Sequence, residues 1–200
     1  DDVARIRDLP KLRQLKISFS ELASVSFLLE LETLRSLTIV STALADPSPI
    51  NALQGLVRLE LWHTGIEDLG FLSNMKNLQA LTVYEPFLSD LSGLRELRSL
   101  TSLNFMMASG VRQVEDLAGL IELKELHLFS GNVANIDSLA GLTKLESLSL
   151  SFNPITDLGA ITNLVALRKL GLSRTQVQSL TPISTLKNLE ELDLSSTLIQ

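Results

Sequence analysis

The stretch LSLSFNPITDLGAITNL, at residues 148–164, decides the fold of this chain. Its beginning alternates apolar and polar residues, with Leu148 and Leu150 on the apolar side, which is the period of a β-strand. Its continuation has an apolar residue at every third position: Ile155, Leu158, Ile161 and Leu164. That spacing is typical of a short 3₁₀ turn. The stretch therefore predicts one strand followed by one tight helical turn.

The same unit recurs along the whole chain. Its strand motif L-x-x-L-x-L, with other apolar residues allowed at the last position, occurs at Leu12/Leu15/Ile17, Leu34/Leu37/Ile39, Leu56/Leu59/Leu61, Leu78/Leu81/Val83, Leu100/Leu103/Phe105, Leu123/Leu126/Leu128, Leu145/Leu148/Leu150, Leu167/Leu170/Leu172 and Leu189/Leu192/Leu194. The first members lie 22 residues apart, except for the 23 residues between Leu100 and Leu123. A unit that repeats in register predicts a solenoid, in which each unit packs on its neighbours.

The residue just before each helical segment has a recurring chemistry. The column contains Ser24, Asp46, Asp68, Asp90, Gln113, Asn135, Asp157 and Ser179. All but Gln113 are residue types whose side-chain oxygens accept from the free backbone N–H groups at a helix start. We therefore interpret the spread-out Asp residues as structural caps and not as catalytic groups.

The units at 145–164 and 167–186, with LSLSFNPITDLGAI and LGLSRTQVQSLTPI, resemble the 22-residue leucine-rich repeats of bacterial internalins. The resemblance implies an α/β fold: one right-handed solenoid with a parallel concave sheet of about nine strands and short 3₁₀ or α turns on the convex side. The column of the family's buried asparagine keeps that residue only at Asn153. Pro86 and Gly131 stand in the same column, so we expect local irregularity there.

We expect residues 1–200 to form a single domain with partial first and last repeats. The chain starts within a unit and stops just after a strand, which favours a fragment of a longer protein. The resemblance leaves the compartment open, and it favours a secreted, surface or host-delivered bacterial protein over a cytoplasmic one.

Composition and motifs exclude several function classes. The net charge of −6 and the pI near 5.0 argue against nucleic-acid binding, which requires clustered Lys and Arg. Without cysteine there is no thiolate metal site and no cysteine nucleophile. No apolar run approaches the ~20 residues of a membrane span, and no nucleotide-binding, calcium-loop, zinc-protease or serine-hydrolase motif is present. We therefore predict that the chain is not an enzyme and binds no cofactor.

The two histidines do not predict a metal site. His63 and His127 belong to units three strands apart, or ~14 Å by strand spacing. Zinc holds its nitrogen ligands at ~2.0 Å, so the two imidazoles cannot share one ion. We expect no metal site, and we favour a monomer.

One column of the repeat changes its residue type in the middle of the chain. The residue after the third apolar strand position is Ser18, Val40, Trp62, Tyr84, Met106, Phe129, Ser151, Ser173 and Ser195. Serine occupies both ends, whereas the five middle units carry large apolar residues, including the only Trp and the only Tyr of the chain. This position should face solvent on the concave side, where a row of large apolar side chains calls for an explanation.

Neighbouring columns extend this surface. They contribute Phe19, His63, Glu85, Met107 and Phe152, and also Glu60, Asn104 and His127. Tyr, Trp and Met are enriched in interface hot spots and adaptable binding surfaces. The sequence therefore predicts a non-catalytic module that binds a protein partner on its concave face.

We assign each predicted site residue a role in that binding. The central anchors are Trp62, Tyr84, Met106, Met107 and Phe129; the patch extends over Val40, Phe19 and Phe152; polar selectivity comes from Glu60, His63, Glu85 and His127. The alternative is a targeting or regulatory repeat domain of a larger bacterial enzyme or effector, with the apolar column packed on another domain. The extra residue near Met106 and Gly110 predicts either a bulge that re-aims side chains or a neutral loop insertion.

Overall fold

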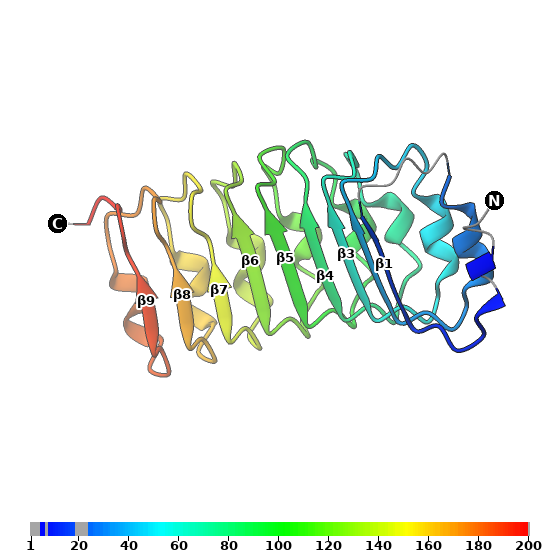
Figure 1. Ribbon diagram of the computed structural model, residues 1–200. Coiled ribbons are helices and arrows are strands. Elements are labelled where there is room, and N and C mark those ends of the chain that lie inside the picture. The colour runs from blue at the N-terminus through cyan, green and yellow to red at the C-terminus, as the bar shows by residue number, and fades with distance from the viewer. Residues whose placement is uncertain (1–4, 7, 19–23, 200) are drawn as a thin grey trace.

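Nine parallel strands form one open sheet in the computed structural model, which describes residues 5–6, 8–18 and 24–199. Each strand pairs with its neighbours in the chain, so β1 and β9 lie at opposite ends of the sheet (Figure 1). The strands are β1 (Gln14–Ser18), β2 (Ser36–Val40), β3 (Arg58–Trp62), β4 (Ala80–Tyr84), β5 (Ser102–Met106), β6 (Glu125–Phe129), β7 (Ser147–Ser149), β8 (Lys169–Gly171) and β9 (Glu191–Asp193). The predicted parallel sheet of about nine strands is confirmed.

Each of the strands β1 to β8 is followed by one 3₁₀ turn, and these turns lie behind the sheet in Figure 1. Strands and turns therefore alternate from β1 to β9. The turns are η2 (Ser26–Glu30), η3 (Ser48–Ala52), η4 (Gly70–Leu72), η5 (Ser92–Leu94), η6 (Glu115–Leu117), η7 (Asp137–Gly141), η8 (Gly159–Asn163) and η9 (Thr181–Thr185). Three residues per turn suit the apolar spacing of three in the sequence.

The predicted caps hold the starts of these turns. In seven units the side chain accepts a hydrogen bond from the backbone N–H two residues later, at 2.7–3.3 Å. That N–H belongs to the first residue of the 3₁₀ turn, so the acceptor stands two positions before the turn begins. Gln113 makes no such bond to Glu115, as its departure from the column predicts.

The core is a continuous stack of leucine columns between the strands and the turns. Leu126, Leu148 and Leu170 occupy equivalent positions in β6, β7 and β8, and each is at most 2% exposed. At the end of the stack Leu192 of β9 is 39% exposed, because no further described unit covers it. Burial in this fold therefore depends on the neighbouring units as much as on the unit itself.

The predicted irregularity at Gly131 has a clear physical form. Asn153 of the next unit donates to the carbonyl of Leu128 at 2.6 Å and accepts from the N–H of Val133 at 3.1 Å. A Cβ atom on Gly131 would lie 2.9 Å from the Asn153 Oδ1. Glycine thus leaves room for the asparagine of the neighbouring unit, which satisfies the backbone on both sides of residue 131.

The extra residue of the fifth unit lies in the loop after β5 and does not bulge the strand. β5 keeps an unbroken five-residue register with β4 and with β6. In the loop, the Ser109 hydroxyl and the Gly110 N–H both donate to the carbonyl of Pro86, at 2.9 and 3.2 Å. A Cβ at Gly110 would lie 2.3 Å from the Leu88 carbonyl oxygen, so this turn requires glycine. Of the two predicted possibilities, the loop insertion is correct.

Candidate binding surface

The apolar stripe consists of Val40, Trp62, Tyr84, Met106 and Phe129, one residue on each strand from β2 to β6. The strands pair so that each of these residues lies directly beside the next. All five side chains are partly exposed, between the buried core leucines on one side of the sheet and solvent on the other. The sequence comparison between units therefore placed this column on the solvent-facing side correctly.

Aromatic rings at the β3–β4 end of the stripe pack on one another. Trp62 and Tyr84 are stacked, with ring centroids 5.7 Å apart and planes 13° from parallel. His63 lies against Tyr84 with a centroid distance of 4.4 Å and a tilt of 59°. Such contacts restrict the orientations that the rings can adopt.

A second aromatic group lies at the β6–β7 end. Phe129 and Phe152 meet at a centroid distance of 4.8 Å with planes tilted by 52°. The guanidinium carbon of Arg174 lies 5.2 Å from the Phe152 ring centroid, within cation–π range. Phe152 is 39% exposed, so this group extends the stripe by one unit towards the C-terminal end.

Side chains at the rim of the sheet are directed by an unusual backbone conformation. The residue after the stripe column takes a positive φ of 50–61° at Ser41, His63, Met107, Ser130, Phe152, Arg174 and Ser196. Non-glycine residues rarely adopt this region, so the turn of each unit imposes it. The conformation carries Met107 and Phe152 out to solvent, with exposures of 43% and 39%.

The prediction that Glu85 lies on the solvent-facing surface is wrong. Glu85 occupies the same rim column but does not have a positive φ, because the following Pro86 restricts the residue before it to extended conformations. Its side chain turns inward and is 1% exposed. The carboxylate accepts hydrogen bonds from the backbone N–H and hydroxyl of Thr64 and from the N–H of Gly65. Glu85 thus satisfies buried backbone of the neighbouring unit, as Asn153 does further along the chain.

Phe87 is a strongly exposed aromatic residue that was not predicted from the sequence. It is 71% exposed in the loop after β4, and among the described apolar residues with large exposure it is the most exposed. The equivalent positions of other interior units hold Ala43, Gly65, Asn132, Pro154 and Gln176. The comparison between units that revealed the stripe would have revealed Phe87 too, had it been extended to this column.

Polar side chains lie along the next concave column. Glu60, Asn104 and His127 are each half-buried on β3, β5 and β6. The His127 Nε2 lies 3.3 Å from the Ser147 hydroxyl of the next strand. Burial lowers the pKa of His127 below its ordinary value of 6.5, although the nearby Glu125 carboxylate acts in the opposite direction. The lowered pKa favours the neutral imidazole, which makes a polar contribution to the face.

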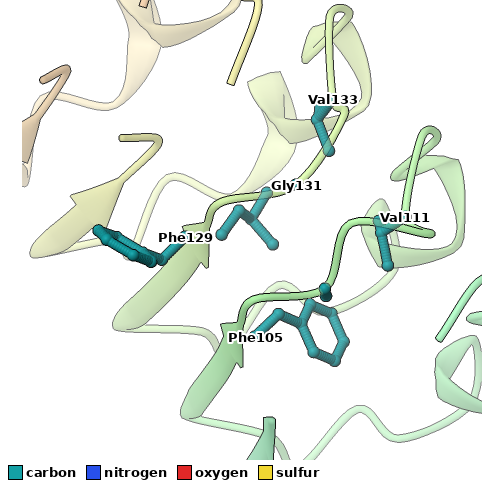
Figure 2. A pocket seen from close by; sticks show the side chains of 7 residues that line it. Phe105, Val111, Phe129, Gly131 and Val133 are labelled. Atoms are coloured by element: carbon teal, nitrogen blue, oxygen red, sulfur yellow. The ribbon is translucent and has the colours of Figure 1, made fainter. Parts of the chain in front are cut away.

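A small apolar pocket lies beneath the stripe between the fifth and sixth units. It is lined by Phe105, Ala108, Val111, Leu128, Phe129, Gly131 and Val133, and its volume is ≈ 10 Å³. Figure 2 shows the Phe105 and Phe129 rings leaving their neighbouring strands on different sides. The volume matches about one water molecule, so this pocket does not accommodate an organic cofactor.

The two histidines belong to different units: His63 directly follows β3, and His127 lies within β6. Within the described ranges, no three His, Asp or Glu residues gather in a way that would hold a metal ion. Across the same residues no helix has the length and apolarity needed to cross a membrane. Phe19, which the sequence placed on the candidate surface, lies outside the described residues.

Comparisons with known proteins agree with this architecture. The family model "Leucine Rich repeats (2 copies)" matches residues 121–163. The structure of an internalin (inlF) from Listeria monocytogenes matches with 26% identity and a TM-score of 0.88, over 98% of this chain and 58% of that chain. The chain therefore spans less than two thirds of that internalin. None of the curated proteins matches this chain.

Two further structures share the fold. Internalin C2 (inlC2) from Listeria monocytogenes matches with 22% identity and a TM-score of 0.83, over 92% of this chain and 81% of that chain. The plant peptide hormone receptor RGFR1, solved in complex with RGF2, matches with 22% identity and a TM-score of 0.72, over 97% of this chain and 33% of that chain. Together with the in-register sheet and the 22-residue unit, these findings show the leucine-rich repeat fold and a similarity to internalin repeat domains.

Proposed function

We propose that the chain is a non-catalytic module that binds a protein partner along the apolar stripe of its concave face. The observation that carries the proposal is the contrast between units that share one backbone. Ser18, Ser173 and Ser195 occupy the stripe column at its ends, whereas Trp62, Tyr84, Met106 and Phe129 replace serine in the middle. Since the fold itself is satisfied by serine, the large side chains serve something other than the fold.

The dimensions of the stripe support this proposal. Four strand spacings separate Val40 from Phe129, or ~19 Å. Phe152, whose ring lies against Phe129, enlarges the apolar area beyond the stripe itself. An area of this size accommodates one helix face or one extended segment of a partner, with aromatic anchors near its centre. The plant receptor of the same fold, solved in complex with RGF2, is a precedent for binding by such a solenoid.

The test is a pull-down with wild-type protein and with the double variant Trp62→Ala/Tyr84→Ala. The control is Ile121→Ala/Val165→Ala, which removes two apolar side chains that are each 52% exposed away from the stripe. All three proteins should give the same circular dichroism spectrum, because neither pair fills the core. We expect one protein to be captured by the wild type and the control and to be lost with the stripe variant.

Other outcomes decide against the proposal. Capture that survives in the stripe variant would place binding elsewhere on the molecule. Capture of nothing by the wild type would favour the alternative, in which the stripe packs on another domain of a larger bacterial enzyme or effector. If Trp62→Ala alone unfolded the protein, the stripe would belong to the core.

A further inference from the structure

The carboxylate of Glu60 lies on the concave face, and no described residue forms an ion pair with it. Its neighbours in the register of the sheet are Thr38 of β2 and Thr82 of β4, and its side chain is half-buried. None of the ion pairs between described residues includes it. A partly desolvated carboxylate without a partner is unfavourable, and an incoming cation would relieve that cost.

Other acids of the sheet show how different this position is. Glu191 of β9 pairs with Lys169 of β8 at 2.7 Å, and Glu125 of β6 accepts from the Ser102 hydroxyl of β5 at 3.0 Å. Arg58, two residues before Glu60 on the same side of β3, makes no ion pair with it. The position therefore presents negative charge to whatever lies along the stripe.

Trp62 follows Glu60 on the same face of β3. The two residues lie two positions apart, or ~6.6 Å along the strand. One face of the indole is stacked on Tyr84 of β4. The neighbour of Trp62 on the other side is the small aliphatic Val40 of β2, and no other ring of the described residues stacks on the indole there. A cation on that face would interact both with the π-system and with the carboxylate, and Trp is the best aromatic residue for such contacts.

The chain makes the same kind of contact internally at the other end of the stripe. There the Arg174 guanidinium lies 5.2 Å from the Phe152 ring centroid. At the β3 end the aromatic face and the carboxylate are present, while none of the described residues supplies the cation in an ion pair. The overall charge of −6 also favours a basic partner segment.

We propose that Glu60 and the outer face of Trp62 receive one Arg or Lys side chain of the segment that binds along the stripe. This inference rests on the proposed function, and it defines the chemistry of the partner: an apolar segment with a cationic residue at its β3 end. Arg suits the position best, because its planar guanidinium stacks on an indole and donates to a carboxylate at once.

The probe is a library of random twelve-residue peptides displayed on phage, selected in parallel on several proteins. A twelve-residue helix is ~18 Å long, close to the length of the stripe. The targets are the wild type, Glu60→Gln, Trp62→Ala/Tyr84→Ala, and Glu32→Gln as a control. Glu32 is an exposed acid between η2 and β2, so its variant loses the same charge outside the concave face.

We expect the wild type and Glu32→Gln to enrich peptides with apolar residues and one Arg or Lys at a fixed spacing from them. Selection on Glu60→Gln should keep the apolar residues and lose the cation. Apolar enrichment without a cation on the wild type, or an undiminished cation on Glu60→Gln, would overturn this inference and leave the proposed function intact. No enrichment on the wild type, or the same peptides on the double variant, would overturn both.

One selected peptide then gives a quantitative test. Trp62 is the only tryptophan, so its fluorescence reports binding at the site directly. Glu60→Gln should raise the Kd about tenfold. Citrulline in place of the peptide arginine should raise the Kd of the wild type by a similar factor. With both changes together the loss should be far less than the product of the two factors. Independent, multiplicative effects would show that the cation binds elsewhere.

Discussion

At the scale of single residues, Pro86 explains why Glu85 is buried. Proline keeps the preceding residue out of the conformation that turns other rim residues outward. The carboxylate that would have faced solvent then satisfies the backbone of Thr64 and Gly65. Pro86, which replaces the polar residue usual in its column, thus gives Glu85 a structural role.

Removing this carboxylate should destabilise the fold. Glu85→Ala removes the acceptor of the Gly65 N–H and leaves the buried Thr64 N–H and hydroxyl without this acceptor, so the free energy of unfolding should fall by about 1–3 kcal/mol. Glu85→Gln keeps one acceptor oxygen and should cost less. Urea unfolding followed by circular dichroism measures both, with Glu67→Ala, an exposed acid of the same region, as the control. Equal stability of Glu85→Ala and Glu67→Ala would contradict the buried role.

His127 predicts a pH dependence of stability. Burial lowers its pKa in the folded protein below 6.5, so the unfolded chain binds the proton more tightly. As the pH falls through 6.5, the unfolded state is protonated first, and stability declines until the lowered folded pKa is reached. The fall in stability between pH 7.5 and pH 5 should be smaller in His127→Gln than in the wild type. If the imidazole resonance of His127 titrated with a pKa at or above 6.5 in the folded protein, the predicted direction of this pH dependence would be wrong.

The positions of residues on the surface or in the core were predictable where they followed the repeat. They were missed where they depended on a local exception. Trp62 could be placed on the concave side because eight other units define the column. Glu85 could not be placed correctly from period alone, since its direction depends on the φ angle that Pro86 imposes. Phe87 is recognisable only by comparison with small or polar residues such as Gly65 and Asn132.

At the scale of elements, each 3₁₀ turn is too short to be stable by itself. It is positioned by the cap before it and by apolar residues that enter the core every third position. The cap side chains explain why Asp, Asn and Ser recur at a surface position in almost every unit. The sequence predicted the acceptors correctly, while the two-residue offset from the turn was visible only in the structure.

A single cap should have a measurable effect on stability. Asp157 accepts from the N–H of Gly159 at 2.8 Å, and Asp157→Ala leaves that donor without its partner. We expect the free energy of unfolding to fall by about 1 kcal/mol. Gln113→Ala is the matched control, because it changes the same column in the unit without a cap bond, and it should be close to neutral. Similar losses in both variants would show that the cap bond is not the cause.

At the scale of the whole molecule, stability comes from contacts between neighbouring units. The fold was predictable because the unit is repeated nine times, so one reading of the strand and turn pattern applies to the entire chain. No contact between distant parts of the sequence had to be guessed. The shape of the loops and the small pocket near Gly131 depend on single substitutions, and they were not predictable in detail.

The same truncation should therefore have different costs along the solenoid. Leu148 is 1% exposed between two neighbouring units, and Leu148→Ala should cost about 2–5 kcal/mol in the free energy of unfolding. Leu192 holds the equivalent position in β9 but is 39% exposed, so Leu192→Ala should cost much less. Chemical denaturation of both variants measures the difference. Equal losses would mean that the last unit is as well packed as the middle ones.

The in-register sheet spaces the large apolar side chains of the stripe evenly, like the marks of a ruler. Adjacent marks are ~4.8 Å apart, whereas one turn of an α-helix advances ~5.4 Å. A helix laid across the strands would thus present about one residue per turn to each mark and drift by only ~2.4 Å between β2 and β6. An extended chain, which advances ~3.3 Å per residue, falls out of step after a single mark. The spacing of the strands by itself thus discriminates between two conformations of the same peptide.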